Sequence, residues 1–132
     1  MYTTMPIRLK SLLLAVFIAL FVLPITSCGS KTNQLQLNAA VGYSGNLYVT
    51  IQNNDPFNWV DVNITLNYDE ENGNSGYMYS TQSIITGFYE RIQTIEFKNM
   101  EGKPLMPQSE LFNIKIQAKG RDGRLRVFTE AW

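Results

Sequence analysis

The stretch Val60-Asp61-Val62-Asn63-Ile64-Thr65-Leu66-Asn67-Tyr68 decides the fold class of this chain. Its apolar side chains alternate strictly with polar ones, a pattern typical of a β-strand that buries one face. Successive side chains on a strand point to opposite faces of the sheet. We therefore expect the even-numbered residues from Val60 to Leu66 to face a core and Asn67 to face solvent.

Alternation of the same kind recurs on both sides of this stretch. The runs are residues 35–43, 47–51, 77–85, 92–97, 112–118 and 125–127. The first two flank the turn-like Ser44-Gly45-Asn46 and predict a hairpin with one buried face. The last two predict a closing hairpin in which Leu125 and Val127 face the core. The run 77–85 alternates raggedly, which indicates one or two edge strands.

The connection over residues 100–110 favours a two-layer arrangement of these strands. Gly102, Pro104 and Pro107 prevent the segment from continuing a strand. A long crossover fits a β-sandwich better than an up-and-down barrel, which is the competing architecture. We therefore expect an all-β protein with a sandwich of about seven strands.

The beginning of the chain has the features of an export signal. Arg8 and Lys10 precede an apolar run over residues 12–22, and Leu23-Pro24-Ile25-Thr26-Ser27-Cys28 follows. This order resembles the lipobox of bacterial lipoproteins over about the first 30 residues. The resemblance implies a helical signal peptide over residues 1–27, cleavage before Cys28, and attachment of diacylglycerol and further acyl chains such as palmitate to that cysteine.

Two other interpretations of this segment fit less well. A membrane-spanning helix needs about 20 apolar residues, whereas the segment 12–25 has 14 and contains Pro24. An ordinary secretory signal shares the basic start and the small residues at the cleavage site but needs no cysteine there. We therefore expect a lipid-anchored protein of a bacterial membrane, at the outer membrane or at the outer face of the cytoplasmic membrane.

The mature chain is expected to hold a tether and one domain. Residues 28–34 form the lipidated cysteine and a polar tether that spans at most roughly 25 Å. Residues 35–132 have the length of a single domain. Without residues 1–27 the chain carries nine basic and eleven acidic side chains, a net charge of −2. A nucleic-acid partner is therefore not expected, because such binders are strongly basic.

Few residues of the mature chain are suited to catalysis or metal binding. Histidine is absent and Cys28 is the single cysteine, so a nucleophile lacks its usual base and no thiolate is left for a metal. Asp69, Glu70 and Glu71 offer oxygen ligands, but Gly73 stands where a calcium loop needs an acid or amide. We expect a solvated turn there, with no cofactor, no metal site and no catalytic residue.

Two groups of residues are candidates for partner binding. The final hairpin carries four basic residues, Lys119, Arg121, Arg124 and Arg126, which suit lipid headgroups or an anionic envelope polymer. The alternative is charge that only keeps the hairpin soluble. Aromatic residues in or beside turns suit a glycan or protein partner, and they include Phe57, Trp59, Tyr77 and Tyr79. Their alternative role is core packing, with Trp59 closing one end of the sandwich.

The layout around residues 59–68 and 85–97 resembles small immunoglobulin-like domains of the FxLYD type in bacterial secreted lipoproteins. The resemblance covers about 60 residues, and the naming motif is altered because Asn67 separates Leu66 from Tyr68-Asp69. The resemblance implies an immunoglobulin-like β-sandwich that serves as a binding or scaffolding module of the cell envelope.

We expect a lipid-anchored binding or assembly module of the cell envelope without catalytic activity. Its partners would be the membrane, through the lipid on Cys28, and an envelope protein or anionic polymer. The alternative is an enzyme or inhibitor that acts on envelope polymers through surface carboxylates. The sequence leaves the oligomeric state open.

Overall fold

A computed structural model describes residues 33–132, so the predicted signal peptide, Cys28 and most of the predicted tether lie outside the described residues. The described chain contains eight β-strands and a short 3₁₀ helix, with no α-helix among these residues. The elements are β1 (Leu35–Gln36), β2 (Ala39–Ser44), β3 (Tyr48–Asn53), β4 (Trp59–Leu66), β5 (Tyr77–Ile84), β6 (Tyr89–Gln93), η1 (Thr94–Glu96), β7 (Asn113–Lys119) and β8 (Leu125–Ala131).

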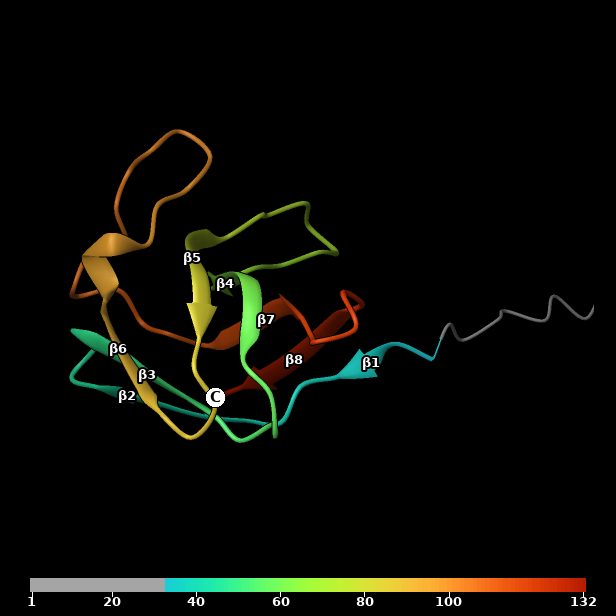
Figure 1. Ribbon diagram of the computed structural model, residues 1–132. Coiled ribbons are helices and arrows are strands. Elements are labelled where there is room, and N and C mark those ends of the chain that lie inside the picture. The colour runs from blue at the N-terminus through green and yellow to red at the C-terminus, as the bar shows by residue number, and fades with distance from the viewer. Residues whose placement is uncertain (1–32) are drawn as a thin grey trace, which may run out of the picture. The chain divides into compact units, whose positions relative to one another are not determined.

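The strands form two sheets that pack face to face (Figure 1). One sheet has the order β1-β8-β7-β4-β5 and the other has the order β2-β3-β6. Neighbouring strands are antiparallel except β1, which runs parallel to β8. The predicted all-β, immunoglobulin-like sandwich is confirmed, and the predicted connection over 100–110 does carry the chain from β6 in one sheet to β7 in the other.

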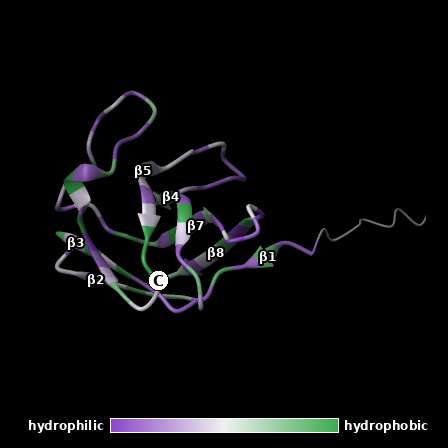
Figure 2. Ribbon diagram, viewed as in Figure 1, coloured by the Kyte–Doolittle hydropathy of each residue, from purple (hydrophilic) through white to green (hydrophobic). Residues whose placement is uncertain are grey.

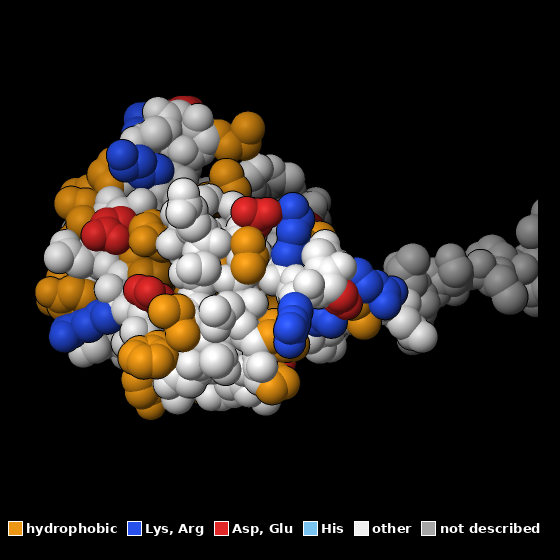
Figure 3. Space-filling model, viewed as in Figure 1, with side chains coloured by type: hydrophobic (Ala, Val, Ile, Leu, Met, Phe, Trp, Pro, Cys, Tyr) orange, Lys and Arg blue, Asp and Glu red, His pale blue; other side chains and the backbone are white. Residues whose placement is uncertain are grey.

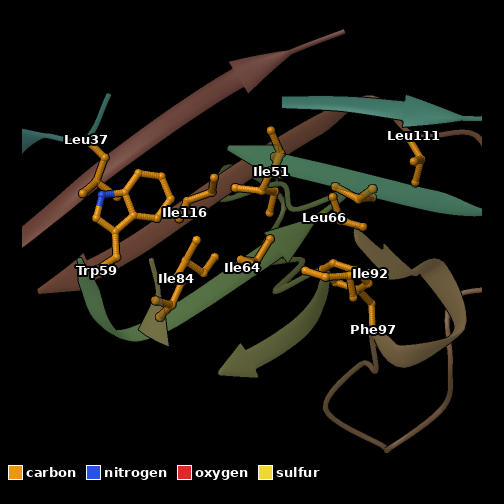
Figure 4. Packing of buried hydrophobic residues seen from close by; sticks show 14 of the residues in the cluster. Leu37, Ile51, Trp59, Ile64, Leu66, Ile84, Ile92, Phe97, Leu111 and Ile116 are labelled. Atoms are coloured by element: carbon orange, nitrogen blue, oxygen red, sulfur yellow. The ribbon is translucent and has the colours of Figure 1, made fainter. Parts of the chain in front are cut away.

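Alternating burial explains why these segments are strands. Hydrophobic residues alternate with hydrophilic ones along the strands (Figure 2), and the apolar side chains of β3 and β7 turn inward. The centre of the core is formed by Val49, Ile51, Ile64, Leu66, Ile114 and Ile116. Trp59 and Leu37 fill one end of it, and Phe97 and Leu111 fill the other (Figure 4). Each fully buried side chain of this size contributes roughly 1.5 to 3 kcal/mol to folding.

The strand directions define two ends of the sandwich. We call one the loop end, because the β3–β4 loop (54–58), the β5–β6 turn (85–88) and the β7–β8 turn (120–124) meet there. The opposite end, called the far end, carries the β4–β5 loop (67–76) and the segment 94–112. Leu35 lies opposite Arg126, the second residue of β8, so the described chain enters the domain at the loop end.

A β-bulge at Asp61 changes which residues of β4 face the core. Asp61 has a φ of 50°, and the pairing of β4 with β7 shifts register between Val60 and Asn63. An extra residue in one strand reverses the side-chain alternation beyond it. Trp59 is therefore buried and Val60 is 44% exposed, so the prediction that Val60 faces the core was wrong. The prediction was correct for the other even-numbered residues of the strand, Val62, Ile64 and Leu66, which are buried.

Asn67 was predicted to face solvent and is instead 7% exposed. Its φ of 54° turns the backbone out of the strand directly after Leu66. The side chain then lies in the far end, where its Nδ2 donates to the carbonyl of Glu110 at 2.7 Å and its Oδ1 accepts from the N–H of Phe112 at 3.0 Å.

The closing hairpin forms as predicted, but the faces of β8 are reversed. Arg126 lies opposite Ala118, which is buried, whereas Leu125 lies opposite exposed Lys119. Leu125 is 52% exposed, so its predicted core position was wrong. Arg126 occupies the inner side of the sheet instead of facing outward, because Phe57 covers that position at the loop end. Val127 is buried as expected, although it lies on the outer side beside β1.

Two other predicted runs are divided between elements. The run 35–43 splits at Leu37 and Asn38, so that β1 joins the five-stranded sheet and β2 joins the other. The run 92–97 contains only the end of β6 and continues as η1. There Thr94 is buried, and its N–H and hydroxyl donate to the carbonyls of Leu47 and Asn46 at 2.9 Å each.

Candidate functional site

A groove of about 570 Å³ lies at the loop end. It is formed by the β3–β4 loop, the start of β4, the β5–β6 turn and the β7–β8 turn. The residues around it are Pro56, Phe57, Asn58, Val60, Thr86, Lys119, Gly120, Arg121 and Gly123. One wall is apolar and another is basic, so the groove brings together Phe57 from the predicted aromatic set and Lys119 and Arg121 from the predicted basic set.

A buried asparagine holds the β3–β4 loop in place. Asn53, at the end of β3, donates from Nδ2 to the carbonyls of Phe57 and Ile84 at 2.9 and 3.0 Å. Its Oδ1 accepts from the N–H of Asp55 at 2.9 Å. Because a buried polar group is costly unless it is hydrogen-bonded, these bonds favour a single arrangement of the loop. The bond from Asn53 to the carbonyl of Phe57 therefore fixes the position of Phe57 at the groove.

The carboxylate of Asp55 ties the loop to two other segments. It accepts from the indole Nε1 of Trp59 at 2.8 Å and from the N–H of Asn38 at 3.1 Å. The hydroxyl of Thr86 donates to the carbonyl of Asp55, and the N–H of Thr86 donates to Asn58 at 3.1 Å. The wall of the groove is thus preformed by bonds among its own loops.

The opposite wall depends on an ion pair within the β7–β8 turn. Arg126 donates from both terminal nitrogens to the carboxylate of Asp122, at 2.8 and 3.2 Å, and the N–H of Arg124 donates to the same carboxylate at 3.1 Å. These bonds lower the pKa of Asp122 to about 2, and they raise the pKa of Arg126. The guanidinium lies 5.1 Å from the ring centre of Phe57. A Cβ on Gly120 would lie 2.6 Å from the Arg126 guanidinium, so a larger residue there would require the end of that side chain to move.

Only part of the predicted basic set is free to meet a partner. Lys119 is paired with Asp61 at 2.8 Å, and Arg126 is paired with Asp122. Among the residues that the structure describes, Arg121 and Arg124 have no ion pair and both are exposed. They are the cations that the turn offers to solvent.

The predicted aromatic set is divided in the same way. Trp59 is fully buried, so its candidate role in partner binding was wrong and its alternative role, closing the core, is the one observed. Tyr77 and Tyr79 lie on β5 and pack partly against the core, with the ring of Tyr79 at 5.6 Å from that of Phe97. Burial raises the pKa of Tyr79. Neither tyrosine contributes to the groove, and Phe57 alone of the four does.

The acidic segment lies at the far end and forms a hydrogen-bonded turn. Asp69 accepts from the N–H and the Nδ2 of Asn72 at 3.2 and 2.5 Å, and these bonds lower its pKa. Glu70 pairs with Lys115. Across residues 33–132 no three His, Cys, Asp or Glu side chains are placed to hold a metal ion. No helix in that part of the chain is long and apolar enough to cross a membrane.

Several groove residues were not predicted as site residues, namely Pro56, Asn58, Val60, Thr86, Gly120 and Gly123. Asn53-Asn54-Asp55-Pro56 indicated only a turn, although such residues also bond to nearby backbone. Val60 reaches the groove because of the bulge at Asp61. No family model matches this chain, and no curated protein matches it in sequence. The groove and the chain's own motifs are therefore the features from which a function can be inferred.

Proposed function

We propose that this protein is a lipid-anchored binding or assembly module of the bacterial cell envelope, without catalytic activity, and that the loop-end groove is its ligand site. The observation that carries the proposal is the preformed groove with one apolar and one basic wall. The lipobox at Cys28 and the resemblance to FxLYD-type domains support the envelope setting.

The lining of the groove selects a class of ligand. Arg121, which has no ion pair among the described residues, attracts an anionic group beside Lys119, whose charge is shared with Asp61. Pro56, Phe57 and Val60 offer apolar contact to an adjoining part of the same molecule. A volume of about 570 Å³ lies within the range of small-ligand sites, roughly 300 to 1,000 Å³. A ligand with one anionic group and an apolar portion fits both walls.

The anchor keeps this module at a membrane, either the outer membrane or the outer face of the cytoplasmic membrane. A single acyl chain binds a bilayer only marginally, whereas two or more hold firmly. Cys28→Ala removes the attachment atom, and we expect the variant to leave the membrane fraction when cells are fractionated. Ser30→Ala, in the tether, serves as the control and should stay with the membranes. A Cys28 variant that fractionates like the unchanged chain contradicts the anchor.

The groove is tested by changing its basic wall. The double variant Lys119→Ser with Arg121→Ser should bind isolated envelope material more weakly than the unchanged chain at low salt. Its control is Lys98→Ser with Lys103→Ser, which removes the same charge from the far end. The Debye length is about 8 Å at physiological salt, so the difference should shrink as salt rises. Equal binding by the two double variants would count against the groove.

A further inference from the structure

The point at which the chain enters the domain restricts how the domain stands on its membrane. Strand β1 runs parallel to β8, with Leu35 opposite Arg126 and Gln36 opposite Val127. Residues 33 and 34, which precede β1, therefore lie at the loop end, beside the β7–β8 turn. Figure 1 shows this turn on the same side of the domain as the point where the described chain begins.

The short tether allows few orientations. Asn33 is the fifth residue after Cys28, and five fully extended steps of the chain span at most about 18 Å. Strand β4 has eight residues, so the sandwich is about 26 Å long in its strand direction alone. A tether that starts at the loop end is too short for the domain to stand upright on its far end.

The exposed side chains of the loop end suit a membrane surface. Phe88 is 66% exposed on the β5–β6 turn, and Ile85 and Leu125 are also exposed. Arg121 and Arg124 project from the neighbouring turn without an ion pair among the described residues. Basic side chains gather beside the start of the described chain (Figure 3). Apolar tips next to basic residues are the composition that binds at a headgroup layer.

The charge of the far end opposes the reverse orientation. Its two segments, 67–76 and 94–112, carry six carboxylates and two lysines. The carboxylates are Asp69, Glu70, Glu71, Glu96, Glu101 and Glu110. An anionic membrane surface repels such an end and attracts the basic turn.

We propose that the loop end rests on the membrane that holds Cys28, and that Arg121 and Arg124 bind the anionic headgroups of its phospholipids. The groove between the β7–β8 turn and Phe57 then receives a headgroup, with the exposed apolar side chains beside it at the level of the upper acyl chains. This inference rests on the lipid anchor of the proposed function and names the ligand of the same site.

The orientation is measured on the full lipidated chain reconstituted in vesicles of phosphatidylethanolamine and phosphatidylglycerol. Phe88→Cys marks the loop end and Met100→Cys, at a position 81% exposed, marks the far end. With Cys28 acylated, each new thiol can be labelled alone with a fluorophore. Lipids with a nitroxide headgroup should quench the label at position 88 and leave the label at 100 bright.

The arginines are tested with the same labels. Each basic residue near an anionic surface contributes about 1 kcal/mol, so removing two weakens docking roughly 30-fold. Arg121→Ser with Arg124→Ser should therefore reduce quenching at position 88. Vesicles of phosphatidylcholine should reduce it in the unchanged chain, whereas the control Lys98→Ser with Lys103→Ser should not.

The outcomes separate this inference from the proposed function. A chain that floats with the vesicles but shows equal quenching at both positions, or more at 100, overturns the inference and leaves the anchor standing. Binding of envelope polymer by the groove, with no dependence of quenching on Arg121 and Arg124, also overturns the inference alone. A chain that does not float with the vesicles overturns both.

Discussion

Buried amide side chains organise both ends of the sandwich. Asn53 ties the β3–β4 loop to the end of β5, and Asn67 joins the end of β4 to the segment before β7. In each case the amide donates and accepts, so its burial leaves no polar atom unpaired. Asparagine also tolerates the positive φ found at Asn67 better than most residues. The alternation pattern predicted a surface position for Asn67, because its partners, Glu110 and Phe112, lie more than 40 residues further along the chain and leave no local signal.

Leu66 and Asn67 should both be sensitive to truncation, for different reasons. Leu66→Ala removes a fully buried side chain and should lower the free energy of unfolding by roughly 2 to 5 kcal/mol. Asn67→Ala loses two hydrogen bonds and leaves a carbonyl and an N–H unpaired, a cost of about 1 to 3 kcal/mol. Both are measured by urea denaturation. Asn67→Gly is the control for backbone strain, since it keeps the positive φ but not the bonds. A neutral Asn67→Ala would contradict the buried role of the amide.

The Asp122 carboxylate should make the stability of the β7–β8 turn depend on pH. Its pKa is lowered from 3.8 to about 2 by Arg126 and the Arg124 N–H. A carboxyl with a depressed pKa in the folded state stabilises that state above the unfolded pKa and loses this effect as pH falls through the folded pKa. The stability advantage of the unchanged chain over Asp122→Asn should therefore be full above about pH 4 and fade toward pH 2. Urea denaturation across this range measures it, and a constant difference would exclude the carboxylate as the cause.

At the scale of elements, strand identity was predictable and strand faces were less so. Alternation located most strands, because one buried face imposes a period of two on the sequence. It failed at the bulge of Asp61, where the period itself breaks, and on β8, where Arg126 on the inner face lies over the ring of Phe57 and Phe128 packs against the core. The division of the first run into β1 and β2 was also hidden, since Leu37 is apolar in either arrangement and both halves fit the alternation.

Strand β1 is short but should contribute to stability and solubility. It covers the edge of β8, and the next residue, Leu37, packs in the core. A fragment of residues 39–132 should have a free energy of unfolding lower than that of a fragment of residues 35–132 by roughly 2 to 5 kcal/mol, the cost of losing a buried leucine, and should therefore unfold at a lower urea concentration. It should also aggregate more, because an edge strand is uncovered. Leu37→Ala in the longer fragment separates the loss of packing from the loss of edge cover. Equal stability and equal solubility of the two fragments would show that β1 is dispensable.

At the scale of the whole molecule, the sandwich was predictable and the groove was not. The long crossover and the number of strands gave the two layers. The groove depends on which loops meet at one end, and that follows from pairings between distant strands. The candidates Phe57, Lys119 and Arg121 were identified by residue type, but the sequence did not show that they adjoin each other or that Trp59 and Arg126 are engaged in packing and ion pairing.

The domain should fold from its own core, without a metal ion or a disulfide. Its fifteen clustered apolar residues span both sheets, and the segment 35–132 contains neither cysteine nor histidine. Circular dichroism of a fragment of residues 35–132 should show β structure that a chelator and a reductant leave unchanged. Loss of this spectrum on chelation, or a helical spectrum, would contradict the expectation.

The parallel pairing of β1 with β8 also determines how the domain responds to mechanical force. If the proposed lipid anchor holds the chain, a pull on it would enter the domain at Asn33 and act along β1. The bonds between β1 and β8, together with the N–H of Leu37 to the carbonyl of Val127 at 3.0 Å, are then loaded in shear and share the tension. The next two residues along the chain would resist further extraction, because Leu37 packs in the core and the N–H of Asn38 donates a hydrogen bond to the carboxylate of Asp55. We therefore expect tension applied at Asn33 to reach the β3–β4 loop through Asp55, which would couple the shape of the groove to the load on the proposed lipid anchor.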